Sequence, residues 1–301
     1  MKKNVFFGFL FVVFAVVSCK SGTNNEDQTG KVVPIEKDST ELVTDSVVSV
    51  EQTAPIDLSD SIKKEKYTKE ITDTLIGGVN FKRYHFSINT KDLSDETLLI
   101  LPVSGNDEAN KKIIKRLIDD YSIDADSVQN QLEGRFNAYA DGNYAEEGDE
   151  YHESELIAYP LNVLDGKYIA YILHSSLFWP SEQNHPQWAD LYYMFDMNTG
   201  DVIILGDIYD ASQEIRQTVG AKIHEELVKF AGNEEDIFAE AGPDLLNASF
   251  VFDDKGMTFF YAPYEVGPYM LGEPEVFLSK EWLEPYLKKD GILYEYWFNK
   301  R

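Results

Sequence analysis

The chain has 301 residues, of which 27 are Lys or Arg and 53 are Asp or Glu, so its formal net charge is −26 at pH 7. This balance argues against nucleic-acid binding, which needs a basic surface to neutralise phosphates. The hydrophobic fraction of 43%, with 18 Tyr and 18 Phe, is sufficient for a sizeable core. The acidic excess favours a cationic partner, although a requirement for solubility explains it equally well.

The first residues have the features of an export signal. Two lysines precede an almost wholly apolar run, 5–17, whose helical length of about 20 Å is shorter than the roughly 30 Å hydrocarbon core of a membrane. The run ends in Val16-Val17-Ser18-Cys19, which resembles the lipobox read by lipoprotein signal peptidase. Cys19 is the only cysteine, so a disulfide or a cysteine metal cluster within the chain is excluded. We expect a signal peptide at 1–18 and a lipid anchor on Cys19; an ordinary secretory signal with a chance cysteine is the alternative.

Residues 19–66 are expected to form a lipidated, disordered tether. From Lys20 onward, polar residues and Val alternate without helical or strand periodicity, and aromatic residues are absent. Lys20 stands where Asp is the usual inner-membrane retention signal, so we expect the outer membrane of a Gram-negative cell, with surface exposure to be tested. Three Asp-Ser tripeptides resemble the acceptor motif of a bacterial O-glycosylation system; the alternative is a compositional preference. Their candidate acceptors are Ser39, Ser46 and Ser61.

A folded region is predicted from Tyr67 onward. Two strands are expected over 67–89 around the Gly77-Gly78 turn, and a third over 97–103. An apolar stripe then predicts a helix that begins at the cap candidate Asn106 and reaches Tyr121. A second helix is expected from about Asp126 to Tyr139.

Three more hairpins are predicted, at Asp165-Gly166, Asn198-Thr199-Gly200 and Asp254-Lys255-Gly256. They join the expected strands 156–164 and 167–178, 191–197 and 202–205, and 245–253 and 257–261. A long helix is expected over 212–230, and a short strand over 275–278 precedes a last short helix that Ser279 caps and that runs through 287. This grouping indicates an α+β fold, with antiparallel β-sheet hairpins and helices packed on the sheets. We expect two interlocked subdomains, an N-terminal one at 67–145 and a C-terminal one at 146–301.

The stretch Phe259 to Gly272, FFYAPYEVGPYMLG, followed by EVFL at 275–278, resembles the closing motif of a bacterial domain family of unknown function. The family is the C-terminal extracellular domain of RsiV-type anti-sigma factors, which sense lysozyme, and it also occurs beside polysaccharide deacetylases. Residues 195–209 are similar to its Asp-x-x-Thr-Gly pattern, and 184–186 to its His-Pro loop. Residues 101–110 resemble the partner domain that usually precedes it. The resemblance covers about 67–287 and implies an extracytoplasmic binding module. The anti-sigma role is not implied, because no internal transmembrane helix and no sigma-binding segment is predicted.

Catalytic motifs are missing from the sequence. It has no Gly-x-Ser-x-Gly elbow, P-loop or dinucleotide-binding glycine pattern, so we expect no enzyme activity and no cofactor. His224 lacks the second histidine that a zinc-binding helix needs four residues later. His152, Glu153 and Glu155 form a possible ion-binding group, but such groups arise by chance at this acid content, and we expect no metal.

Aromatic side chains are the better candidates for ligand binding. Tryptophans in a loop between strands stack on sugars or anchor protein interfaces. The alternative is that these rings close the core and that Glu265 accepts backbone hydrogen bonds. The candidates are Trp179, His185, Trp188, Tyr264, Glu265 and Tyr269.

We therefore expect a lipid-anchored, non-enzymatic module that binds or senses an extracytoplasmic partner. The expected partner is a cationic protein such as lysozyme, or a peptidoglycan or other cell-wall glycan, and the membrane is contacted through the lipid on Cys19. Two alternatives are a cell-envelope glycan or peptidoglycan hydrolase accessory and a purely structural envelope lipoprotein.

Overall fold

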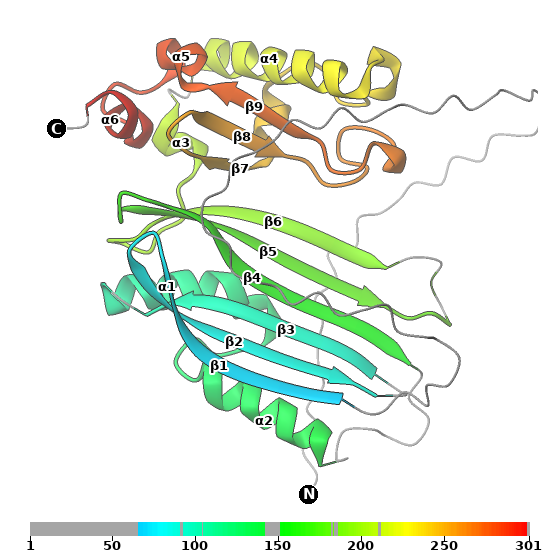
Figure 1. Cartoon of the computed structure of the whole chain (residues 1–301). Helices are drawn as coiled ribbons and strands as arrows, with labels where there is room; N and C mark the ends of the chain where they lie inside the picture. The colour runs from blue at the N-terminus through cyan, green and yellow to red at the C-terminus, as the bar shows by residue number, and fades with distance from the viewer. Residues whose placement is uncertain are drawn as a thin grey trace, which may run out of the picture. The chain divides into compact units, whose positions relative to one another are not determined.

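The computed structural model describes residues 66–90, 93–103, 105–141, 151–181, 183, 186–209 and 212–299 (Figure 1). These residues lie within the compact unit Lys63–Arg301. The predicted signal peptide, the tether, Cys19 and the three candidate glycosylated serines lie outside the described residues. None of the helices in the described part of the chain has both the length and the apolar character that a membrane span requires.

Six strands form one mixed sheet in the order β1-β2-β3-β4-β5-β6. All neighbouring pairs are antiparallel except β3 and β4, which are parallel. A parallel pair needs a long crossover connection, and two helices with a short 3-10 turn between them provide it. The strands are β1 (Lys66–Ile76), β2 (Val79–Asn89), β3 (Leu93–Pro102), β4 (His152–Leu164), β5 (Tyr168–Phe178) and β6 (Gln187–Asp196). The crossover contains α1 (Asp107–Ile118), η1 (Asp119–Tyr121) and α2 (Val128–Ala140).

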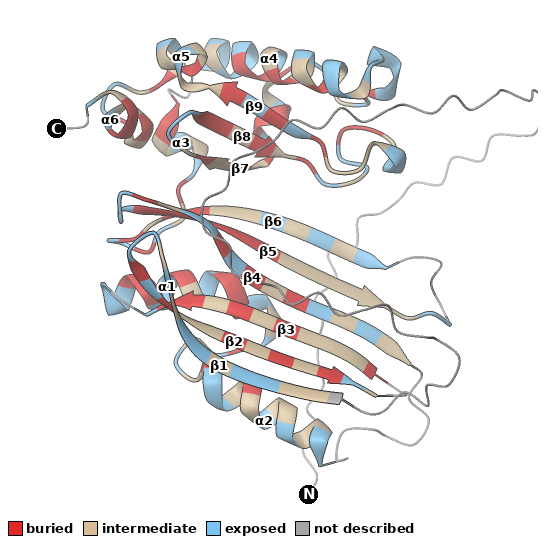
Figure 2. Cartoon of the chain, in the orientation of Figure 1, coloured by how far each residue is buried: buried red, intermediate tan, exposed pale blue. Residues whose placement is uncertain are grey.

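Helices α1 and α2 cover one face of this sheet (Figure 1). The core between them contains Phe81, Leu99, Ile113 and Tyr171, and the Tyr171 hydroxyl donates a hydrogen bond to the carbonyl of Ile100 at 2.9 Å. Figure 2 shows buried residues alternating with less buried ones along the central strands. Because side chains alternate between faces, β5 turns Tyr171 toward the helices and sends every second side chain to the opposite face, where Tyr168 and Ala170 are buried in a second core.

The residues after β6 form a three-stranded antiparallel sheet with its own helices, and their core also includes Leu164, Tyr168, Ala170 and Met194 of the six-stranded sheet. A ring stack joins the two sheets: the Tyr192 ring of β6 lies 3.7 Å from the Phe260 ring, at an interplanar angle of 7°. The strands are β7 (Ser249–Phe252), β8 (Gly256–Phe260) and β9 (Glu275–Ser279). The helices are α3 (Leu205–Ile208), α4 (Gln213–Ala231), α5 (Lys280–Leu283) and α6 (Ile292–Phe298). Shorter 3-10 turns are η2 (Glu234–Asp236), η3 (Pro243–Asn247), η4 (Tyr269–Leu271) and η5 (Glu284–Tyr286).

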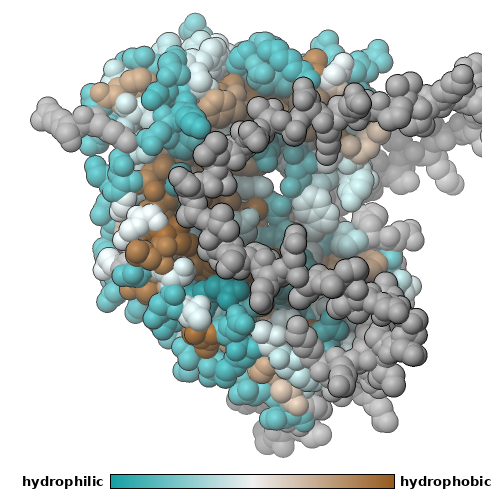
Figure 3. Space-filling model, in the orientation of Figure 1, coloured by the Kyte–Doolittle hydropathy of each residue, from teal (hydrophilic) through white to brown (hydrophobic). Residues whose placement is uncertain are grey.

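The β1–β2 turn lies against the end of β4. A Cβ atom added at Gly77 would come within 2.7 Å of the Val163 Cβ, so only glycine permits this approach. Large apolar side chains on β1 and β4 remain exposed, including Leu75 at 66% and Leu161 at 41%. Figure 3 shows that hydrophobic residues gather in one area of the visible face, while hydrophilic residues cover much of the remainder.

The predicted α+β class and the four hairpin turns are confirmed. The caps Asn106 and Ser279 are confirmed as well, since each side chain accepts a backbone N–H of its helix. The parallel β3–β4 pair was not predicted. The predicted boundary at 145–146 falls within 142–150, outside the described residues, and stays a prediction.

Two predicted strands were wrong in part. Residues 202–205 make a single bridge, between Phe195 and Val202, because the Asp207 carboxylate accepts the Ile204 N–H at 3.0 Å and begins α3. The expected strand over 245–253 starts only at 249, because η3 begins at Pro243 and occupies the preceding residues. Helix α6 was not predicted.

Candidate functional site

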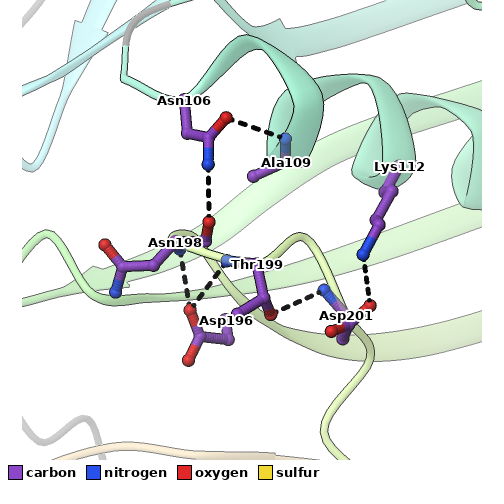
Figure 4. Close-up of polar contacts among 7 residues, drawn as sticks. All are labelled: Asn106, Ala109, Lys112, Asp196, Asn198, Thr199 and Asp201. Atoms are coloured by element: carbon purple, nitrogen blue, oxygen red, sulfur yellow. Dashed lines mark hydrogen bonds and ion pairs between the residues drawn. The ribbon is translucent and has the colours of Figure 1, made fainter.

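The turn after β6 contains the Asp-x-x-Thr-Gly pattern, and its polar groups bond to one another (Figure 4). Asp196 Oδ1 accepts hydrogen bonds from the backbone N–H groups of Asn198 at 2.7 Å and Thr199 at 3.2 Å. Thr199 Oγ1 in turn accepts the N–H of Asp201 at 3.2 Å. These bonds replace the ladder bonds that a tight turn cannot make, so the pattern has a structural role.

The same turn is fastened to the start of helix α1 (Figure 4). Asn106 caps the helix by accepting the N–H groups of residues 108 and 109, and its Nδ2 donates to the Asn198 carbonyl at 2.8 Å. Lys112 forms an ion pair with Asp201 at 2.9 Å. Gly200 has φ +73°, and a Cβ there would lie 2.3 Å from the Ala109 carbonyl oxygen. Helix α1 and the turn are therefore in backbone contact.

The segment between β8 and β9 is a compact loop with a closed base. The Tyr261 N–H donates to the Pro274 carbonyl at 3.1 Å, and the buried Tyr261 hydroxyl donates to the Leu245 carbonyl at 2.6 Å. Glu265 accepts the Ala262 N–H at 2.8 Å through its carboxylate, and its own N–H donates to the Ala262 carbonyl at 3.0 Å. Glu265 thus makes the backbone contact that the alternative interpretation assigned to it, and it clamps the turn.

Tyr264 lies at the tip of this clamped turn with its side chain outside. Its φ is +69°, a conformation that a bulky L-residue adopts at a cost of about 1–2 kcal/mol, and the residue is 65% exposed. Its ring lies 5.4 Å from the Tyr269 ring at 34°. Tyr269 and Met270 are exposed too. The loop therefore presents an aromatic pair that it does not bury; we call Tyr264 and Tyr269 with their clamp the Tyr264 turn.

A cavity of about 410 Å³ opens on the face of the six-stranded sheet that the helices leave uncovered. Strands β4, β5 and β6 provide most of its lining, and Glu273, just before β9, also contributes. It is lined by Glu153, Glu155, His174, Ser176, Phe178, Pro186, Trp188, Asp190 and Glu273.

His174 is held between two carboxylates of this cavity. Its Nδ1 lies 2.5 Å from Asp190 Oδ1, and its Nε2 lies 3.3 Å from Glu155 Oε2. Ser176 donates to the same Glu155 oxygen at 3.3 Å. The Trp188 ring is stacked beside the imidazole, at 6.5 Å between centroids and 27° between planes. Both imidazole nitrogens are thereby occupied within the protein.

Glu273 has an altered acidity. Burial raises its pKa first, and the charge of Asp190 and a hydrogen bond with Asp190 add to this, so the pKa of Glu273 is raised to about 7. His174 opposes the shift only in part. The Glu273 carboxyl therefore stays protonated up to nearly neutral pH.

The predicted site residues separate into two groups. Trp188 lines the cavity, whereas the Trp179 ring stacks on His152 with centroids 4.5 Å apart. His185 lies outside the described residues. Tyr264 and Tyr269 meet each other in the Tyr264 turn and are not among the cavity-lining residues.

Sequence reasoning missed His174, Asp190 and Glu273. A signal was present, because alternation along the predicted strand 167–178 places His174 and Ser176 together on one face. The same alternation places Glu153 and Glu155, two members of the possible ion-binding group, on one face, and both line the cavity. Among the described residues, no group of three or more His, Cys, Asp or Glu is arranged to hold a metal ion.

Comparisons with known proteins identify a domain in the C-terminal part of the chain. Residues 202–281 match a family model described as "Protein of unknown function (DUF3298)". A member of the DUF3298 family from Bacteroides fragilis NCTC 9343 is similar in structure, with a TM-score of 0.52 at 13% identity, covering 79% of this chain and 98% of that one. A DUF3298 family protein from Pseudomonas aeruginosa PAO1 has a TM-score of 0.47 at 15% identity, covering 76% and 96%. The first likeness shows a shared fold. A search of the curated proteins found no match.

Proposed function

Because residues 202–281 carry a DUF3298 domain, we propose that this protein is a non-enzymatic extracytoplasmic module that binds or senses an envelope or host protein. Its ligand is a basic protein of the lysozyme type, as the resemblance to RsiV-type sensors implies, with a cell-wall glycan as the second candidate. A lipid on Cys19 holds the module to the outer membrane.

The Tyr264 turn is the observation that carries this proposal. Its backbone is held at a positive φ by the Glu265 clamp, yet the Tyr264 ring is 65% exposed and gains little burial in return. Strain that the surrounding structure maintains without a packing reward is concentrated at functional sites. Tyrosine is also enriched among the residues that dominate binding energy at protein interfaces. A rigid, exposed aromatic pair is suited to anchoring a partner.

The charge of the chain supports a basic partner. The formal net charge of −26 attracts a cationic protein over a distance of about one Debye length and raises its association rate. The aromatic pair would then slow dissociation, because desolvated anchors act mainly on the off-rate. Charge and aromatic anchor thus have separable kinetic signatures.

Surface plasmon resonance tests the proposal with the full chain in detergent against lysozyme and soluble peptidoglycan fragments. Tyr264→Ala should cost about 2 kcal/mol, or roughly thirtyfold in affinity, mostly through faster dissociation. Phe230→Ala removes a comparably exposed aromatic side chain from α4 and should leave the affinity unchanged. Absence of binding to both ligands would sink the proposal, and an equal effect of the two variants would reject the Tyr264 turn as the anchor.

The anchor is tested separately. Cys19→Ala should release the protein from membranes or leave it unprocessed, because the thiol is the acceptor of the lipid. Incorporation of radiolabelled palmitate should disappear in this variant, and incorporation that persists would contradict lipidation at Cys19.

A further inference from the structure

We propose that the cavity on the face of β4, β5 and β6 opposite α1 and α2 binds the guanidinium group of an arginine side chain. The proposal deepens the proposed function and rests on it for the source of the arginine, a basic protein. The cavity and the Tyr264 turn share no residue, so each can be tested without the other.

The charges of the lining select a cation. Four carboxyl groups and one imidazole face the cavity, and none of its described lining residues is Lys or Arg. The described contacts of these carboxylates are with neutral hydroxyls, with His174 and with one another. An anionic ligand would meet repulsion, and a neutral polyol would leave the charge uncompensated. A cation compensates it directly.

The shape of the lining favours a planar cation. Trp188, Phe178 and Pro186 supply an apolar wall beside the carboxylates. A guanidinium stacks on an indole face while its N–H groups reach carboxylate oxygens at its edge, which a compact ammonium cannot do as well. The adjacent carboxyls of Asp190 and Glu273 offer the paired acceptors that this fork needs. A volume of about 410 Å³ accommodates the side chain with some water.

His174 serves as a positioning residue. Its two nitrogens contact Asp190 and Glu155, so it fixes the direction of both carboxylates and has no nitrogen left for a ligand. The Asp190 side chain is only 14% exposed, which limits its alternative rotamers. The acceptors are therefore arranged before the ligand arrives, and this reduces the entropy cost of binding.

Binding of the cation should release a proton. The groups that face Glu273 are Asp190, His174 and Glu275. Burial, Asp190 and Glu275 raise its pKa to about 7 against the opposing effect of His174, so its carboxyl stays protonated up to about that pH. A guanidinium beside Glu273 favours the ionised form of that carboxyl. Affinity should accordingly rise between pH 6 and pH 8, by no more than about tenfold for one proton over this range.

Saturation-transfer difference NMR of the full chain in detergent provides the test, with N-acetyl-arginine amide as the probe. N-acetyl-citrulline amide has nearly the same shape without the charge, and N-acetyl-lysine amide has the charge without the plane. We expect a signal for arginine, one several-fold weaker for lysine, and none for citrulline. Asp190→Asn and Glu273→Gln should each weaken arginine binding about tenfold or more. Glu234→Gln is the matched control, because it removes one exposed carboxylate from η2, outside the cavity lining.

Each outcome is decisive. Equal signals for arginine and citrulline, or for arginine and lysine, would overturn the proposal. An equal loss in Glu234→Gln would assign the binding to net charge and overturn it too. Asn and Gln keep the size of the groups they replace, and circular dichroism of both variants establishes that the fold is intact. Arginine binding without lysozyme binding would remove the proposed function and leave this site standing.

Discussion

Two turns in this protein carry recognisable sequence patterns, and they use their polar and aromatic groups in opposite ways. The turn at 196–201 directs its carboxylate, hydroxyl and carbonyl groups inward, to itself and to α1. The Tyr264 turn uses one carboxylate to hold its backbone and places its rings outside. A recognisable pattern therefore indicates a joint between elements in the first case and an exposed surface in the second.

The comparison also separates two settings of a positive φ. Gly200 has φ +73° at a position where the backbone of α1 leaves no room for a Cβ atom, so only glycine fits there. Tyr264 has φ +69° with its side chain in solvent, so no packing requirement explains its conformation. Substitution should therefore damage stability at the first turn and binding at the second.

The largest expected effect is that of Gly200→Ala. The new methyl group would meet the Ala109 carbonyl oxygen in a left-handed backbone, so we expect a loss of about 3 kcal/mol or more and a fall in Tm on the order of 10 °C. Gly166→Ala is the matched control, because Gly166 has φ +66° in a hairpin turn with nothing within 4 Å. It should cost only the strain of about 1–2 kcal/mol. Equal losses in thermal denaturation would show that the contact with α1 is unimportant.

The opposite response is expected for Tyr264→Gly. Glycine tolerates the positive φ, so the Tm should stay the same or rise, while loss of the ring should weaken ligand binding by about 2 kcal/mol. Tyr264→Phe keeps the ring and should retain most of the affinity. Differential scanning fluorimetry and surface plasmon resonance measure the two effects. A clear fall in Tm for the glycine variant would mean that the ring stabilises the fold.

A smaller effect is expected at the joint between α1 and the first turn. Asn106→Ala removes both the helix cap and the bond to Asn198, and should cost roughly 1–2 kcal/mol in chemical denaturation. Asn106→Asp keeps the cap acceptor and loses only the Nδ2 donor, so it should cost less than the alanine variant. Equal costs would assign the whole effect to the bond with Asn198.

The smallest effect concerns the pH dependence of stability at Glu273. Its pKa is raised from an ordinary value near 4.5 to about 7, so the folded protein binds more protons than the unfolded chain between these values. The resulting contribution of Glu273 to the stability of the folded state is complete below pH 4.5 and is lost as the pH rises through 7. Glu273→Gln should therefore have a higher Tm relative to the parent at pH 8 than at pH 5, by a few degrees. The same difference at both pH values would contradict the raised pKa.

Local signals predicted the elements of this fold well. The hairpin at Asp165-Gly166 and the cap at Asn106 depend on residues close in sequence, so turn chemistry and periodicity were sufficient. The strand expected over 202–205 failed because a side chain two residues beyond it, Asp207, starts a helix instead. Strand pairing was harder, since no local feature of β3 states that its neighbour is the distant β4.

The candidate site was predictable only in part. The Tyr264 turn lies within one continuous motif, and its exposed tyrosines were named from the sequence alone. The cavity is assembled from three strands and the segment before β9, and His174 acquires its partners Asp190 and Glu155 only through strand register. A raised pKa at Glu273 depends on burial and on Asp190, neither of which is visible along the chain.

The parallel pairing of β3 with β4 also imposes an order on folding. Partner residues Asp95 and Ser154 are 59 positions apart, whereas the flanking hairpins close over short turns. During synthesis, β1 to β3 are complete well before β4 exists, and β3 then has an open hydrogen-bonding edge. Contacts of such separation are slow to form because loop closure must precede them. The strand at the centre of the finished sheet is thus the one most exposed to aggregation while the chain is incomplete.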